Sequence, residues 1–176
     1  MLSFLKAVTA LFCIAFGVVA PEAPKKDVKD LLGKPLPPFQ MTALNGKSVN
    51  NATIKGHPAV IDFWATWCGP CAKASPVMEG LFEEFGSRGL MVIGADGLED
   101  TMGPGPAKAY ATKHSYNYLF THSNDKLMDE WGVTGVPTII FVDRTGKVAK
   151  VQVGFMDSNK DDFFKLASNL VSKPKK

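Results

Sequence analysis

Cysteine is scarce in this sequence, and its scarcity excludes several kinds of architecture. The 176 residues contain three cysteines, Cys13, Cys68 and Cys71. Cys13 lies inside an apolar run near the start of the chain, which leaves one pair at CxxC spacing and no framework of several disulfides. A zinc site on that pair would need two more ligands, and the sequence has no second CxxC and no paired-histidine motif. We therefore expect no metal, and a pair that is chemically active rather than structural.

The chain also lacks a strong excess of charge of either sign. Its 20 Lys and Arg and 17 Asp and Glu give a formal net charge of +3, and the lysines are spread out except in the tail at 173–176. We expect no nucleic-acid partner, and we interpret the basic tail as a solvated chain end. The sequence has no internal repeat and no Walker, Rossmann or EF-hand motif, so no cofactor is expected.

The first 20 residues differ in composition from the rest. An uncharged run covers 7–20 behind Lys6, which fits an export signal better than a full membrane span. Ala20 ends a stretch suited to cleavage, but Pro21 follows at once, so residues 1–20 are interpreted as a signal peptide or a membrane anchor. Both alternatives place the remainder outside the cytoplasm, in the periplasm or on the outer face of the membrane, either secreted or tethered.

The rest of the chain is expected to form one domain behind a linker. Residues 21–37 are charged and contain several prolines, as linkers do, and the domain is expected over 38–172. An Asn-Gly turn predicts a hairpin at 39–49. Alternation of strands and helices after it predicts an α/β fold with parallel strand pairing. The expected strands cover 60–64, 90–95, 116–121, 138–142 and 147–155, and the expected helices begin near residues 68, 106, 125 and 158.

The CxxC cysteines stand where a buried strand gives way to a helix. The run 60–64 is apolar apart from Asp62, and apolar residues recur at helical spacing over 77–85. Cys68 is therefore expected at the helix N-terminus, and Cys71 one turn inside. Free amide groups and the positive end of the helix dipole stabilise a thiolate there. Cys68 is the expected nucleophile of thiol-disulfide exchange, and Cys71 the resolving thiol.

Two segments resemble features of a known superfamily. The segment Asp62-Phe63-Trp64-Ala65-Thr66-Trp67-Cys68-Gly69-Pro70-Cys71 resembles the active-site strand and turn of thioredoxin, and Gly135-Val136-Pro137-Thr138 resembles its cis-proline loop. The N-terminal apolar segment, the hairpin, Pro76 and the long insert at 97–116 are similar to those of the TlpA/ResA-like extracytoplasmic branch. The resemblance covers 37–170. It implies a thioredoxin-like α/β fold, with a central mixed sheet flanked by helices, an N-terminal β-hairpin and a central insert.

The resemblance also implies roles for individual residues. Asp62 would be the buried acid that accepts the Cys71 proton through water, and Pro137 would be cis and lie opposite the cysteines. The Val136 backbone would pair with an extended substrate strand. The other expected substrate-binding residues are Trp67 at the rim of the site, Gly69 and Pro70. Ala74 stands where the TlpA/ResA-like branch often has a glutamate, so the role of that glutamate does not carry over.

Together these features predict a thiol-disulfide oxidoreductase. The Gly-Pro pair between the cysteines resembles the reducing thioredoxins, so the expected activity is reduction of disulfides in client proteins. We expect a monomer. The resemblance implies that a membrane thiol carrier delivers the electrons, and that a client has its own CxxC, such as an apocytochrome awaiting haem attachment. The insert at 97–116 is expected to influence the choice of client. Three alternatives remain open: a disulfide oxidase or isomerase, a protein-binding module that uses the surface around Trp67 and Val136, and a copper-handling protein.

Overall fold

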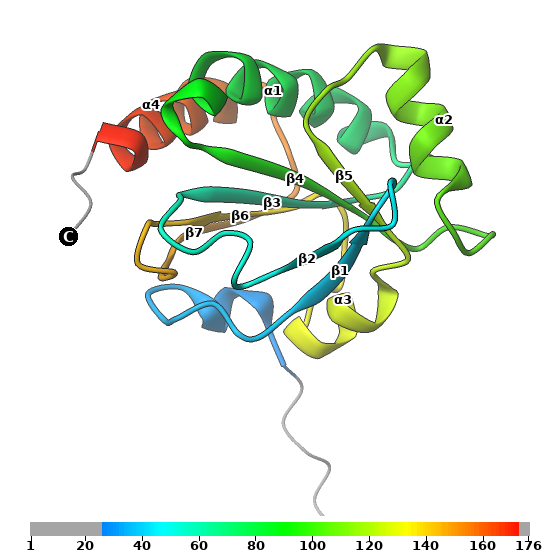
Figure 1. Ribbon diagram of the computed structural model, residues 1–176, viewed down its shortest axis with the longest axis horizontal. Helices are drawn as coiled ribbons and strands as arrows, with labels where there is room; N and C mark the ends of the chain where they lie inside the picture. Colours follow the sequence, from blue (N-terminus) through cyan, green and yellow to red (C-terminus); the bar gives the residue numbers. More distant parts are fainter. Residues whose placement is uncertain (1–25, 173–176) are drawn as a thin grey trace, which may run out of the picture.

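The computed structural model describes residues 26–172, so the predicted signal peptide or anchor, Cys13 and the basic tail lie outside the described residues. The strands are β1 (Gln40–Ala43), β2 (Ser48–Asn50), β3 (Ala59–Trp64), β4 (Met91–Asp96), β5 (Leu119–His122), β6 (Thr138–Val142) and β7 (Val148–Val153). They form one seven-stranded sheet in the order β2-β1-β5-β4-β3-β6-β7 (Figure 1). Because β3, β4 and β5 pair in parallel and the other pairs are antiparallel, the sheet is mixed.

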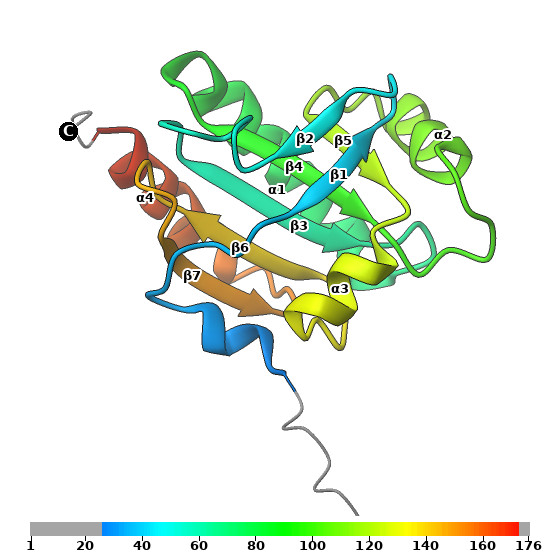
Figure 2. The ribbon, with the colours of Figure 1, turned by 60° about the horizontal axis from the view of Figure 1, so that its bottom comes forward.

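Helices cover both faces of this sheet (Figures 1 and 2). The helices are η1 (Val28–Leu31), α1 (Gly69–Phe85), η2 (Gly86–Arg88), α2 (Gly105–His114), α3 (Asp125–Trp131) and α4 (Asn159–Ser172). Helices α1, α2 and α4 lie on one face, and α3 and η1 lie on the other. Each face of the sheet packs its own cluster of buried apolar side chains. The predicted α/β architecture with helices flanking a mixed sheet is therefore confirmed.

Strand β3 occupies the centre of the sheet. It pairs in parallel with β4 and antiparallel with β6, and all six of its residues are buried. Its even-numbered residues, Val60 and Trp64, pack beneath α1, whereas Ile61 and Phe63 pack on the opposite side. A strand covered on both faces has no polar side, which explains its nearly continuous apolar sequence. Asp62 is the exception to that sequence and lies on the α1 face.

The predicted elements agree with the structure at the hairpin and differ at one strand. Strands β1 and β2 pair antiparallel around the Asn-Gly turn, as predicted. The strand expected over 116–121 begins only at Leu119. The reason is that the backbone amides of Asn117 and Tyr118 donate to the carboxylate of Glu79 on α1, at 2.8 and 3.3 Å, instead of to a neighbouring strand. The expected insert at 97–116 consists of a loop followed by α2.

The linker prediction for 21–37 does not hold for residues 28–36. Val28 and Leu36 are only 2% and 7% exposed and belong to the core on the α3 face of the sheet. The amide of Val28 donates to the carbonyl of Gly132, and Pro35 forms an isolated bridge with Lys147 beside β7. The apolar residues of this stretch are buried by contacts with segments about a hundred residues away. Its charge and proline content, on which the linker prediction rested, do not reveal such contacts.

Within residues 26–172, no helix combines the length and the apolar character that crossing a membrane requires.

We predict that Gly132→Ala detaches the N-terminal segment. Gly132 ends α3 at a φ of +71°, and a Cβ there would lie 2.5 Å from the carbonyl oxygen of Lys26. Gly146 is a matched control, because its φ is +85° but a Cβ would meet nothing within 4 Å. The left-handed backbone alone should cost about 1 kcal/mol in each variant. Gly132→Ala should lower the free energy of unfolding further, and it should speed tryptic cleavage near Lys29; equal effects of the two variants would contradict the prediction.

Candidate active site

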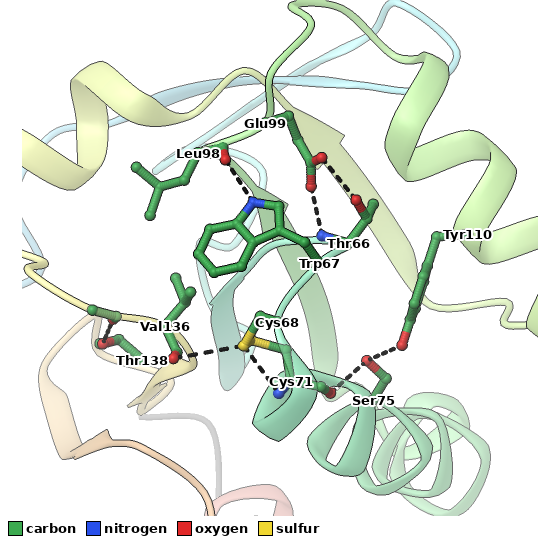
Figure 3. Close-up of a disulfide and its surroundings, with 11 residues drawn as sticks. Thr66, Trp67, Cys68, Cys71, Ser75, Leu98, Glu99, Tyr110, Val136 and Thr138 are labelled. Atoms are coloured by element: carbon green, nitrogen blue, oxygen red, sulfur yellow. Dashed lines mark hydrogen bonds between the residues drawn. A yellow bond between two sulfur atoms is a disulfide. The ribbon is translucent and has the colours of Figure 1, made fainter.

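Cys68 and Cys71 form a disulfide at the start of α1, directly after the turn that follows β3 (Figure 3). Cys68 is the N-cap residue of α1, and Cys71 lies in the first turn, as predicted. Their Cα atoms are 5.2 Å apart. Cys68 is 5% exposed and Cys71 is fully buried, whereas Gly69 and Pro70 are exposed between them. Cys68 is therefore the sulfur that an external thiol or disulfide can reach.

The start of α1 favours negative charge on Cys68. The backbone amide of Cys71 donates to the Cys68 sulfur across 3.1 Å. The first turn of the helix contains no acidic residue that would oppose a thiolate. Free amides and the helix dipole both stabilise an anion at this position. The nucleophile expected from the sequence thus lies where its reactive form is stabilised.

The cis-proline loop lies beside Cys68. The Val136–Pro137 peptide bond is cis, and the Val136 carbonyl oxygen is 3.6 Å from the Cys68 sulfur (Figure 3). Two hydrogen bonds hold the loop: the Thr138 hydroxyl donates to the Gly135 carbonyl at 2.7 Å, and the Gly154 amide donates to the Pro137 carbonyl at 2.8 Å. The predicted cis peptide and its place next to the cysteines agree with this geometry. The substrate-pairing role of Val136 stays a prediction.

Trp67 forms an apolar rim next to the disulfide. Its side chain is 62% exposed, and its indole nitrogen donates to the Leu98 carbonyl at 2.8 Å (Figure 3). Leu98 is itself 43% exposed. The rim therefore combines a residue of the active-site turn with one from the loop after β4.

Asp62 is a buried acid without a partner. Its side chain is fully buried, and neither carboxyl oxygen has a hydrogen-bond partner among the described residues. Burial raises the pKa of Asp62 well above its ordinary value, because desolvation disfavours the charged form. The expectation that Asp62 is buried is confirmed, and its role in proton transfer stays a prediction. Ala74 is also fully buried, so α1 presents no acid at that position.

Two further carboxylates beside the site are absent from the sequence-based prediction. Glu99 accepts hydrogen bonds from the Thr66 amide at 2.5 Å and from the Thr66 hydroxyl at 2.7 Å, which holds the active-site turn (Figure 3). Asp96 ends β4 next to Trp64, the last residue of β3. The pKa of Asp96 is raised to about 8, and the largest cause is burial of its carboxyl group. The hydrogen bond and charge of Glu99 and the charge of Asp125 raise it further. One feature of the sequence could have indicated these two acids. They come at the end of or just after the strand that pairs in parallel with β3, so they lie at the same edge of the sheet as the cysteines.

No group of three or more His, Cys, Asp or Glu side chains within 26–172 is arranged to hold a metal ion. A disulfide at a helix N-terminus, a cis-proline loop against it and a buried acid in the preceding strand are the features of a thiol-disulfide oxidoreductase.

Comparisons with known proteins agree with this class. The Redoxin family matches residues 31–167, and the chain therefore belongs to the Redoxin family. The thiol-disulfide oxidoreductase ResA of Bacillus thuringiensis subsp. konkukian is 32% identical over 126 residues, which cover 70% of each protein. The thiol:disulfide interchange protein DsbE of Pseudomonas fluorescens biotype C is 31% identical over 129 residues, covering 72% of this chain and 69% of that protein.

A solved structure supports the fold. The crystal structure of a thiol:disulfide interchange protein of the thioredoxin family from Chlorobium tepidum TLS matches with a TM-score of 0.68 and 26% identity, covering 86% of this chain and 99% of that one. The expected thioredoxin-like fold and the resemblance to ResA/TlpA-like proteins are thus confirmed. The protein is a thioredoxin-like thiol-disulfide oxidoreductase.

We predict that Asp96 makes the protein less stable as the pH rises. In the unfolded chain its carboxyl ionises near pH 3.8, whereas in the folded protein it keeps its proton up to about pH 8. Folding therefore takes up a proton between these values, and the free energy of unfolding falls with rising pH by at most about 1.4 kcal/mol per unit. Asp96→Asn should remove this part of the slope in urea unfolding between pH 5 and about pH 7.5. The exposed neighbour Asp100→Asn should leave the slope unchanged, and an unchanged slope in Asp96→Asn would contradict the prediction.

Proposed function

We propose that the protein reduces disulfides of client proteins outside the cytoplasm. The observation that carries this proposal is the placement of the cysteines: Cys68 reaches the surface at a helix N-terminus, and Cys71 lies buried behind it. Such a pair attacks a client with one thiol and releases it with the other. Gly69 and Pro70 between the cysteines support the reducing direction, by the resemblance to reducing thioredoxins.

The reaction proceeds in two exchanges. The Cys68 thiolate attacks one sulfur of the client disulfide, the client S–S bond breaks, and one client thiolate leaves while a mixed disulfide forms. Cys71 then loses its proton to Asp62 and attacks the Cys68 sulfur, which expels the second client thiolate. The client gains two electrons, and the enzyme ends with the Cys68–Cys71 disulfide. The raised pKa of Asp62 brings the acid closer to a thiol in proton affinity, so that the transfer is less uphill.

The client binds across the apolar rim and the cis-proline loop. An extended client strand pairs with the backbone of Val136, next to Cys68, while Pro137 holds that backbone close. Trp67, Gly69 and Pro70 are exposed around the sulfur and contact the client residues that flank its cysteine. The loop and α2 within 97–116 supply further contacts that select the client.

The cellular setting of this proposal comes from the N-terminal sequence and the family. Residues 1–20 act as a signal peptide or a membrane anchor, and the domain is a monomer in the periplasm or on the outer face of the membrane. A membrane thiol carrier returns the Cys68–Cys71 disulfide to the dithiol. Clients carry their own CxxC, as apocytochromes do before haem attachment during cytochrome c maturation.

The first test is the reduction potential of the Cys68–Cys71 pair in a defined thiol-disulfide buffer. We expect a value near about −270 mV, in the range of thioredoxin; a value near about −120 mV would instead identify an oxidant.

Cys71→Ser should accumulate a mixed disulfide with a disulfide-containing peptide, whereas Cys68→Ser should not. If the pair does not cycle between dithiol and disulfide, and the protein still binds its partner after both cysteines are replaced, the protein is a binding module. A thiol-dependent Cu(I) complex would indicate copper handling.

The second test addresses Asp62. Asp62→Asn should slow resolution of the mixed disulfide by about tenfold or more, because Cys71 loses its proton acceptor. The rate at which iodoacetamide alkylates Cys68 should stay within about twofold, since that thiolate is stabilised by the helix N-terminus. Stopped-flow measurement of resolution, with alkylation as the control, separates the two effects. Unchanged resolution would remove Asp62 from the reaction.

A further inference from the structure

Leu98, in the loop after β4, has a backbone conformation that its side chain disfavours. Its φ is +61°, in the left-handed region that residues with a Cβ rarely adopt unless their surroundings hold them there. Both of its backbone polar groups are engaged. The Leu98 amide donates to Oδ1 of Asp125 at 2.9 Å, and its carbonyl accepts from the Trp67 indole at 2.8 Å (Figure 3). This one strained residue therefore connects the start of α3 with the rim of the active site.

The polar side chains at the start of α3 are directed at this loop. Asp125 is the first residue of α3, a position where an acid usually stabilises the free amides of its own helix. Among the described residues, however, the only hydrogen bond that its side chain accepts comes from the Leu98 amide. The preceding residue, Asn124, donates from its side-chain nitrogen to the carbonyl of Asp96 at 2.9 Å. The start of α3 thus holds the loop after β4 in two places.

Gly97 allows the loop to lie directly against α3. A Cβ at Gly97 would lie 2.8 Å from the sulfur of Met128 and 3.5 Å from the backbone nitrogen of Asp125. The helix is itself fixed on the sheet, because its inward-facing residues belong to the core on that face: Leu127, Met128 and Trp131. A loop residue that is bonded to the start of α3 is therefore held in a defined place relative to the sheet.

Both ends of α3 support a segment that lies beside Cys68. At its start, the helix holds Leu98, which in turn holds Trp67. At its end, Gly132 caps the helix, and four residues later the Val136 carbonyl lies 3.6 Å from the Cys68 sulfur (Figure 3). The seven residues of α3 span only about 10 Å. One short, buried helix therefore fixes the apolar rim and the cis-proline loop relative to each other.

We propose that Asp125 is a positioning residue for client binding, because it holds Leu98 in the conformation that keeps the Trp67 indole beside Cys68. The proposal rests on the proposed function, in which Trp67 contacts the client residues that flank the client cysteine. Asp125 itself contacts neither the client nor the sulfurs. An indole that is already held in place spares the client the cost of ordering it on binding. Without the Asp125 bond, Leu98 relaxes toward a more common backbone conformation, its carbonyl turns away, and the indole is released.

The test is Asp125→Ala in the full chain, which removes the acceptor of the Leu98 amide. In dithiothreitol-driven reduction of a disulfide peptide, KM should rise about fivefold while kcat stays within about twofold. Reduction of hydroxyethyl disulfide, which has no flanking residues, should be unchanged. Asp125→Asn keeps an acceptor without the charge and should restore the KM of the peptide. Asp129→Ala is the matched control, because Asp129 is an exposed acid of the same helix.

The state of the rim can be measured without turnover. Hydrogen exchange of the Trp67 indole N–H, followed by NMR and assigned with Trp67→Phe, should be faster in Asp125→Ala and unchanged in Asp129→Ala. Glycine adopts the left-handed conformation without a penalty, so Asp125→Ala should speed this exchange less in a Leu98→Gly background. Asp125→Glu keeps the negative charge at the start of α3 and displaces the acceptor; it should raise KM as well, and it provides the test if Asp125→Ala does not fold.

The outcomes separate this proposal from the proposed function. Unchanged indole exchange in Asp125→Ala, or faster exchange with an unchanged KM for the peptide, would overturn the positioning role alone. Equal losses with the peptide and with hydroxyethyl disulfide would assign Asp125 a general structural effect and would also overturn it. If the wild-type protein reduced neither substrate, the proposed function would fail instead, and the indole exchange would still show whether Asp125 holds Trp67.

Discussion

Coverage of β3 on both faces is the constraint on which the rest of the site depends. A strand that is buried on both sides is held in place along its whole length, so the turn that leaves it delivers Cys68 to a defined position at the start of α1. The same coverage removes Asp62 from water and raises the pKa of its carboxyl group, because desolvation disfavours the charged form. One packing arrangement therefore sets both the place of the nucleophile and the proton affinity of the acid beneath it.

The site keeps polar groups that weaken the fold. Asp62 and Tyr118 are buried without hydrogen-bond partners among the described residues, and Asp96 lies buried beside a second carboxylate. Apolar residues of similar size would cost less in each position. The three residues lie between the sheet and α1 or at the edge where α1 begins, which is the side of the sheet that carries the two cysteines.

The sequence predicted the features that depend on local pattern. The Asn-Gly hairpin, the N-cap position of Cys68 and the burial of Asp62 follow from residues close to one another in the chain. The structure added features that depend on distant segments. The backbone amide of Val28 donates to the carbonyl of Gly132, and Glu99 accepts two hydrogen bonds from Thr66 in the active-site turn. The two residues of each pair lie far apart in the chain, and no sequence motif links them. Charge and composition therefore could not predict these contacts.

Trp67 is held in place by the main chain of the loop after β4 rather than by a side chain. Its indole nitrogen is held by the main-chain carbonyl of Leu98. Every amino acid supplies that carbonyl, so the indole bond does not depend on the side chain at position 98, although the φ of +61° favours residues that tolerate a left-handed backbone. The exposed side chain of Leu98 is in this way separable from the bond that holds Trp67. Under the proposed function, the loop after β4 is a place where substitutions change client selectivity while the indole bond of Trp67 is kept.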